Sequence, residues 1–355
     1  FLSTPYVNIA IAAAIPSALF YFALFAQIDA YAARNGLKGL EPAEVPRLRD
    51  TLREGWPYAL VFALLIFMMV GLRQETAAPY ASSLLLLVIN QFFPGQRMTL
   101  RKLRDLLLNI GTNLASLTSV ILGVGLIVGA FSATGLAGTL VNELLFIAGD
   151  NVFLLLIMGA VTAFIFGMGM TATACYIFLA IVLAPALETG GLNRIAVHLF
   201  ILYWGMVSYI TPPVALGAFA AANLAGTSPL RAGFEAMRLG SIIYVLPFLF
   251  VMNPALIGHS GAAEVALAVA CAFSGVALIS MGLQGYVIFV GTLDGRGRHL
   301  LRVLLALGGF FLALPAMPFM GIGYGVTAVI GLALAALPIA VAYRRDRAKP
   351  VATQA

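Results

Sequence analysis

Charge is scarce in this sequence, and its scarcity excludes a water-soluble globular protein. Charged residues make up 10% of the 355 residues, whereas a soluble domain has about 25%. Hydrophobic residues make up 62%, and the mean hydropathy is +1.01. A membrane-spanning helix needs about 20 largely apolar residues, and many such stretches are present. The composition therefore predicts an all-α integral membrane protein, a polytopic helix bundle in a lipid bilayer.

Cysteine and clustered titratable residues are scarce as well. Cys175 and Cys271 lie in separate apolar segments without metal-ligand spacing, so both are expected to be small buried hydrophobes. Nearly all of the 14 acidic residues fall in loops or at segment ends, and Asp29 comes closest to a spanning position. A membrane enzyme would need clustered His, Asp or Glu residues, so no catalytic residue is expected.

The three histidines sit near predicted membrane boundaries and do not cluster: His198, His259 and His299. We interpret them as interfacial residues rather than as ligands. Proton-coupled carriers usually keep a buried carboxylate or histidine as a relay. Since none is central in this sequence, coupling to a cation held by neutral oxygens is favoured.

Positive charge predicts the orientation in the membrane and not nucleic-acid binding. The 20 Lys and Arg residues cluster in a few short loops, as the positive-inside rule expects. Placing the basic stretches 34–54 and 97–104 in the cytoplasm makes residues 4–33 run inward, and the basic C-terminal tail is then cytoplasmic too. Residues 97–104 open an amphipathic helix that is expected to lie in the membrane interface.

Apolar stretches predict the remaining spans. They lie at residues 56–72, 76–93, 112–130, 239–257, 263–280, 300–314 and 322–343. Residues 281–292 fit either one more span or an interfacial segment. Basic residues precede the first of the last two spans and follow the second, and both groups belong in the cytoplasm. This placement favours the interfacial segment.

A polar, glycine-broken patch interrupts the apolar block 151–189, where residues 166–176 read F-G-M-G-M-T-A-T-A-C-Y. Each half of the block has about 15 residues, or roughly 22 Å of helix, too short to cross a core of about 30 Å. Two short halves joined by a polar tip predict a re-entrant hairpin that enters from the periplasm. Gly167 and Gly169 allow unusual backbone geometry that frees carbonyls, and the threonines at 171 and 173 supply hydroxyls.

A second break, I-T-P-P at residues 210–213, interrupts the apolar segment 195–224. Consecutive prolines remove two backbone donors and disfavour helix at the preceding residue. In hydrocarbon, backbone that leaves the helix needs partners elsewhere, and secondary transporters use discontinuous helices of this kind around their sites. The two breaks together predict a buried solute or ion site, and the alternative is a glycine-rich packing face with kinked helices.

The candidate ion- and substrate-binding residues surround the two breaks. They are Gly167, Gly169, Thr171, Thr173, Ser208, Tyr209, Thr211, Pro212 and Pro213. Gly167, Thr173 and Thr211 are the candidate oxygen ligands of a sodium ion. Tyr176 and Asn223 are further polar side chains close in sequence to the breaks. The half-helices that begin after Thr171 and Pro213 carry partial positive charge at their N-termini, which suits a carboxylate.

Several motifs resemble the membrane permease of tripartite ATP-independent periplasmic (TRAP) transporters, specifically the fused TAXI type. They are P-Y-V-N-I-A-I-A-A-A-I-P-S-A-L-F-Y at 5–21, G-M-G-M-T-A-T-A-C-Y-I at 167–177, A-P-A-L at 184–187, H-L-F at 198–200, I-T-P-P-V-A-L at 210–216 and A-A-N-L-A-G at 221–226. The likeness extends from residue 1 to about residue 257. The family usually has G-M-G-L-P-T-T-A at the hairpin, so Thr171 stands for a proline and Ala172 for a threonine, which is expected to alter ion geometry or substrate preference.

The resemblance implies an elevator-type ion transporter with inverted repeats, each holding a hairpin and a broken helix. Residues 1–33 would then be the last helix of a first repeat, and 34–110 the arm and scaffold helices. Residues 111–257 would form the second repeat, and 258–355 a C-terminal membrane extension with a basic cytoplasmic tail. No upstream hairpin is present, so the chain is expected to be the C-terminal portion of a permease and not to transport alone.

The function implied by the resemblance is sodium-coupled uptake of small organic acid anions across a bacterial inner membrane. A periplasmic TAXI-type solute-binding protein would deliver the substrate. Two alternatives stay open: a non-transporting polytopic scaffold, and a proton-coupled carrier.

Overall fold

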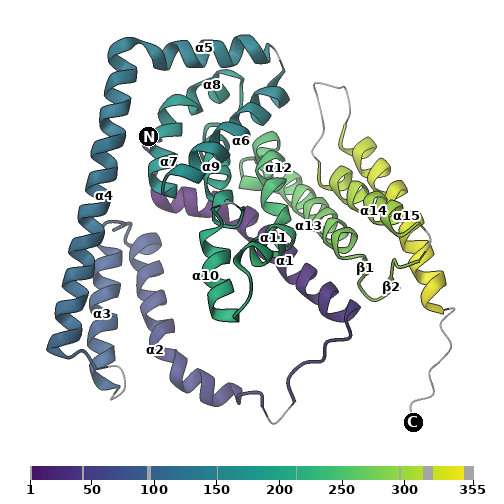
Figure 1. The fold of residues 1–355 in the computed structure, drawn as a ribbon, viewed down its shortest axis with the longest axis horizontal. Helices are drawn as coiled ribbons and strands as arrows, with labels where there is room; N and C mark the ends of the chain where they lie inside the picture. Colours follow the sequence, from purple (N-terminus) through teal and green to yellow (C-terminus); the bar gives the residue numbers. More distant parts are fainter. Residues whose placement is uncertain are drawn as a thin grey trace. The chain divides into compact units, whose positions relative to one another are not determined.

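The computed structural model describes residues 2–41, 44–93, 97–149, 151–212, 214–295, 297–314 and 323–347. These residues form helices throughout, apart from loops and one two-stranded sheet (Figure 1). This confirms the predicted all-α membrane fold. The chain folds as two compact units: a larger unit with residues 1–2, 11–37 and 128–355, and a smaller unit with residues 3–10 and 38–127.

Three described helices are long and apolar enough to cross a membrane, and a fourth span is possible if a bent helix pair counts as one. They are α1 (Tyr6–Arg34), α13 (Ala262–Gln284) and the part of α15 (Tyr324–Arg347) that covers residues 325–345. The predicted spans 4–33, 263–280 and 322–343 correspond to these helices. Their length and composition support a multi-pass membrane protein.

The smaller unit contains a helical hairpin. Its first arm is α2 (Leu48–Ile66), which continues into the π-helix η1 (Phe67–Gly71), and its second arm is α3 (Ala78–Phe92). The first arm begins inside the charged stretch 34–54, earlier than the predicted start at residue 56. A π-helix widens the backbone by one residue and is frequent at functional sites.

Helix α4 (Leu100–Thr134) differs from the prediction. An interfacial helix followed by a separate span at 112–130 was expected, but one continuous helix of 35 residues replaces both. Its length is roughly 52 Å at the helical rise. The segment contains no proline, and a single glycine such as Gly111 costs a helix only about 1 kcal/mol, which is too little to end it.

The larger unit carries both predicted breaks. After α5 (Leu136–Ala148), the hairpin consists of α6 (Val152–Gly169), α7 (Ala172–Val182) and α8 (Ala184–Thr189). The broken helix consists of α9 (Arg194–Met206), the 3₁₀ turn η3 (Val207–Tyr209) and α10 (Leu216–Ala225). Neither α6 nor α7 reaches the length of a full span, as a re-entrant hairpin requires.

The predicted span at 239–257 is not one continuous helix. The chain there breaks into α11 (Pro229–Leu239), η4 (Ser241–Tyr244), α12 (Leu246–Met252) and η5 (Pro254–Ile257), with a bend of 66° after α11. Pro247 and Pro254 each occupy the start of a new helical piece, because proline has no N–H to continue the preceding one. Hydropathy alone did not reveal these breaks.

The C-terminal region forms a bundle of α13, α14 (Arg298–Ala313) and α15, which lie side by side in Figure 1. Between α13 and α14, strands β1 (Tyr286–Val287) and β2 (Gly291–Thr292) pair antiparallel. Residues 281–292 are therefore the end of α13 and a β-hairpin, not a further span. Gly275 and Gly309 let α13 and α14 approach closely, since a Cβ on either would overlap the backbone of the other.

Candidate functional site

The hairpin break is much shorter than its sequence pattern predicted. Helix α6 continues through Gly167 and Gly169, so both glycines have helical geometry and the expected unusual backbone is absent there. Only Met170 and Thr171 are extended. The Thr171 hydroxyl accepts a hydrogen bond from the Ala174 N–H at 3.4 Å, which makes Thr171 the N-cap of α7.

Helix α7 returns along α6 from this break. The Cys175 thiol lies 3.7 Å from the Ala163 carbonyl, and the rings of Phe166 and Phe178 are 4.8 Å apart. Cys175 is buried, as expected of a small hydrophobic residue, whereas Cys271 is half-buried. These contacts hold the two arms of the hairpin together.

The second break is held by side-chain and backbone hydrogen bonds. Buried Thr211 lies 2.7 Å from the Val207 carbonyl and 2.6 Å from the Tyr244 hydroxyl. Ala215 adopts left-handed backbone geometry, with φ 37°, immediately before α10. A non-glycine residue in this region carries strain of about 1–3 kcal/mol and is a feature of functional sites. Pro212 packs against α11, where a Cβ on Gly233 would lie 2.8 Å from its ring.

The two breaks contact each other. The Ser208 hydroxyl donates to the Gly167 carbonyl at 2.8 Å, with the Gly205 carbonyl also in reach at 3.2 Å. The Tyr209 hydroxyl accepts from the Ala172 N–H at 3.4 Å, so its own O–H remains a donor. The backbones of Gly167 and Gly205 approach so closely that a Cβ on Gly167 would overlap the Gly205 carbonyl. The absence of a side chain at Gly167 therefore allows α6 and α9 to pack closely.

A cavity of about 280 Å³ lies between the two breaks. The described residues that line it are Gly167, Met168, Met170, Thr171, Ser208, Tyr209, Val214 and Leu216. Four of the nine candidate residues are in this set. Its polar groups are uncharged hydroxyls and backbone, and the positive end of the α7 dipole lies at residues 171–174.

The remaining candidates lie elsewhere. The lining of the cavity includes neither Thr173 nor Thr211, and the Thr211 hydroxyl lies instead beside the Val207 carbonyl and the Tyr244 hydroxyl. Pro213 and the side chain of Asn223 lie outside the described residues, and Gly169 sits in the last turn of α6. The three oxygens predicted for sodium, from Gly167, Thr173 and Thr211, are not gathered around this cavity.

His198 of α9 makes contacts that the sequence pattern did not predict. Its side chain is buried, and its Nδ1 lies 2.9 Å from the Tyr176 hydroxyl. Its Nε2 lies 3.3 Å from Glu188, whose other oxygen lies 3.5 Å from Arg194. The sequence did not reveal this series of side-chain contacts, because Glu188 and His198 belong to different helices. Their positions on either side of one short loop were the available signal.

The other two histidines form simpler contacts. His259 lies 3.3 Å from the Asn193 amide, and exposed His299 accepts from the neighbouring Arg298. Within the described ranges, no group of three or more His, Cys, Asp or Glu residues could hold a metal ion.

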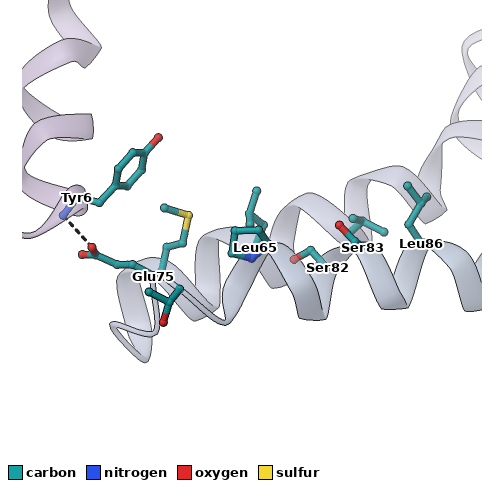
Figure 2. Close-up of a pocket in the computed structure, with 10 residues that line it drawn as sticks. Tyr6, Leu65, Glu75, Ser82, Ser83 and Leu86 are labelled. Carbon is teal, nitrogen blue, oxygen red and sulfur yellow. Dashed lines mark hydrogen bonds between the residues drawn. The ribbon is translucent and has the colours of Figure 1, made fainter. Parts of the chain in front are cut away.

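A second cavity, of about 620 Å³, lies in the smaller unit (Figure 2). Its lining residues come from both arms of the α2–α3 hairpin and from the start of α1: Tyr6, Val61, Leu65, Met69, Glu75, Thr76, Pro79, Ser82, Ser83 and Leu86. Glu75 accepts the Tyr6 N–H at 3.0 Å, and the buried Ser82 hydroxyl has no hydrogen-bond partner. Nothing in the sequence pattern predicted this cavity.

Comparison with known proteins identifies a family. A model of the family described as the tripartite ATP-independent periplasmic transporter, DctM component, matches residues 1–265. No curated protein and no solved structure matches the chain. The matched region includes both breaks and both cavities, whereas most of α13 and all of α14 and α15 lie beyond it.

Proposed function

Because the chain belongs to the DctM component family of tripartite ATP-independent periplasmic transporters, we propose that its 280 Å³ cavity binds a small organic acid anion during uptake. DctM components are permeases, so the chain is a multi-pass transport protein and not an enzyme. The observation that carries the proposal is the contact between the hairpin tip and the broken helix around one polar cavity. A break of either kind alone would need no ligand; their meeting at a cavity is what a transport site requires.

The chemistry of the cavity supports a carboxylate as the bound group. The N-terminus of α7 presents partial positive charge, and Thr171 and Tyr209 add hydroxyls from the hairpin and the broken helix. These groups stabilise negative charge without a buried cation. The cavity volume of about 280 Å³ lies just below the range of about 300–1,000 Å³ for ligand sites, which favours a small acid.

We propose sodium as the coupling ion. Neutral oxygens at helix ends suit sodium, and the cavity offers the Thr171 and Ser208 hydroxyls and the Gly167 carbonyl. Ser208 donates to Gly167 in this conformation, so ion binding requires the Ser208 hydroxyl to turn away. In this proposal the hydroxyls of Thr171 and Ser208 take the place of Thr173 and Thr211, the ligands that the sequence had suggested.

The partners follow from this role. A periplasmic TAXI-type solute-binding protein delivers the acid, the permease lies in a bacterial inner membrane, and its C-terminus faces the cytoplasm. The basic groups at the ends of α1, α14 and α15 support this orientation through the positive-inside rule.

Uptake of labelled substrate tests the proposal. The complete transporter, reconstituted in proteoliposomes with its binding protein, is expected to accumulate an organic acid only with an inward sodium gradient. The non-transporting scaffold predicts no uptake under any gradient. Tyr209→Phe removes the hydroxyl that faces the cavity and is expected to weaken uptake, whereas the matched control Tyr80→Phe, on exposed Tyr80 of α3, is not.

Proton coupling is a second candidate, and His198 favours it. A buried histidine between a carboxylate and a tyrosine is the arrangement that proton relays use. In this case a proton gradient drives uptake without sodium, and His198→Gln abolishes that uptake. If uptake follows sodium and His198→Gln only lowers thermal stability, the histidine has a structural role.

A further inference from the structure

The cavity of about 620 Å³ in the smaller unit has one polar end and continues along the α2–α3 hairpin. Figure 2 shows Tyr6 beside Glu75 at the polar end, with Ser82 and Leu86 further along α3. The volume lies within the range of about 300–1,000 Å³ that is usual for ligand sites. The described lining of this cavity shares no residue with the 280 Å³ cavity, so its ligand need not be the transported solute. We call it the α2–α3 groove.

Apolar side chains from both arms of the hairpin line most of the groove. Val61 and Leu65 of α2 and Met69 of η1 recur every four residues, which places them along one side of the first arm. Pro79 and Leu86 of α3 are seven residues apart and line the groove from the second arm. Because water gains little from contact with such a surface, the groove suits a hydrocarbon chain.

The polar end of the groove lies at the depth of the lipid headgroups. Helix α1 is long enough to cross a membrane and begins at Tyr6. The Tyr6 N–H donates to Glu75 at 3.0 Å, so the turn that carries Glu75 lies where α1 enters the bilayer. Basic residues follow the other end of α1, in the stretch 34–54, so the positive-inside rule predicts the periplasmic leaflet for the start of α1 and for this turn.

The turn at the polar end carries charges of both signs. Glu75 lines the groove, and a carboxylate has about four lone-pair sites, so the Tyr6 N–H leaves room for further donors. Arg73, two residues earlier, is exposed and has left-handed backbone geometry with φ 52°, which is strained for a residue other than glycine and is found at functional positions. A headgroup with both a phosphate and a primary ammonium complements this pair of charges.

A buried hydroxyl lies deeper in the groove. Ser82 lines it and is 5% exposed, and its hydroxyl has no hydrogen-bond partner in the described part of the chain. Ser82 lies four residues after the start of α3 at Ala78, or roughly 6 Å along the helix. Buried hydroxyls are normally satisfied, and the ester carbonyl of a glycerolipid, just inside the headgroup, is an acceptor for this one. A bare hydrocarbon chain offers no such acceptor.

We propose that the α2–α3 groove binds phosphatidylethanolamine of the periplasmic leaflet. The ammonium group donates to Glu75, the phosphate lies on the side of Arg73, an ester carbonyl accepts from Ser82, and one acyl chain follows the apolar sides of the two arms. Phosphatidylglycerol has no ammonium group and brings only negative charge towards Glu75. The bound lipid joins the start of α1 to the α2–α3 hairpin.

Lipid retention by the full chain tests the headgroup part of this proposal. The chain is purified from nanodiscs with equal amounts of phosphatidylethanolamine and phosphatidylglycerol, and native mass spectrometry counts the retained lipids. Wild type is expected to retain phosphatidylethanolamine preferentially. Glu75→Gln keeps an oxygen for the Tyr6 N–H but removes the charge, so the ratio of the two lipids is expected to fall about twofold to fivefold. The matched control is Glu264→Gln, on an exposed glutamate in the first turn of α13, and it is expected to leave the ratio unchanged.

A second pair of variants tests the acyl-chain part. Ser83→Trp puts a large ring into the groove from an exposed position of its lining and is expected to abolish the preferential retention. Leu84→Trp, on the next residue and outside the lining, is the control and is expected to retain lipid as wild type does. Three results overturn the proposal: equal retention of both lipids by wild type, equal ratios in Glu75→Gln and Glu264→Gln, or equal retention in Ser83→Trp and Leu84→Trp. If wild type retains neither lipid, protein or water fills the groove and the proposal is wrong.

Discussion

Replacing Thr171 by valine removes one hydroxyl from the cavity while the side chain keeps its shape. In the proposed transport site this hydroxyl donates to the substrate carboxylate, and hydrogen bonds to charged groups contribute about 1.5–3 kcal/mol. At about 1.4 kcal/mol per tenfold change, Thr171→Val is expected to raise the KM for uptake about 10- to 150-fold. The control is Thr173→Val, two residues further on, where an exposed hydroxyl outside the cavity lining is lost.

Thr171→Val changes the N-cap of α7 as well as the cavity. Two further substitutions therefore separate the effect on stability from the effect on substrate binding. Thr171 caps α7, so valine also costs about 1 kcal/mol of stability. Thr171→Ser keeps both the cap and the hydroxyl and is expected to preserve uptake. Thr171→Asp keeps the cap but adds negative charge to the cavity, so it is expected to abolish anion uptake at nearly unchanged thermal stability.

The assay is sodium-driven uptake by the reconstituted transporter over a range of substrate concentrations, with the thermal stability of each variant measured in the same membranes. If Thr171→Val and Thr173→Val raise the KM equally, or if Thr171→Asp transports normally, the cavity is not the substrate site. The contact between the breaks would then serve packing alone.

Three other substitutions test individual contacts by thermal unfolding. Gly167→Ala forces the hairpin away from α9 and is expected to destabilise by about 1–3 kcal/mol, whereas Gly111→Ala, with open space around it, is not; equal melting temperatures would refute the close approach. Ser208→Ala removes the hydrogen bond to the Gly167 carbonyl, at a cost of about 0.5–1.5 kcal/mol, and no change would mean that the bond contributes nothing. Gln27→Leu leaves the Gln284 amide and a backbone carbonyl without their buried partner, so a loss of about 1–3 kcal/mol is expected, and a stabilised variant would contradict this account.

The positions of the two breaks could be read from the sequence because their causes are local. Thr171 is a residue type that caps helices, and Pro212 begins a proline pair that cannot continue one. The extent of a break was harder to predict. Gly167 and Gly169 both remain helical. The close packing of α6 against Gly205, and not backbone freedom, accounts for the glycine at residue 167.

Contacts between distant segments could not be read from the sequence. Thr171 and Thr173 look equivalent in the motif, but Thr171 is the extended N-cap at the break and Thr173 lies in the first turn of α7, and only Thr171 lines the cavity. The contacts of His198 with Tyr176 and Glu188 also appear only in the folded chain. Hydropathy likewise could not distinguish one long α4 from two helices.

Composition was enough to establish a helical membrane protein, since a chain with 10% charged residues cannot cover itself with polar surface in water. Local residue chemistry was enough to predict that two helices break. Which oxygens share a cavity, and which residue meets Gln284, depends on segments up to 257 residues apart. Such meetings arise from packing between helices, and the pattern of residues along one helix carries no information about its neighbours.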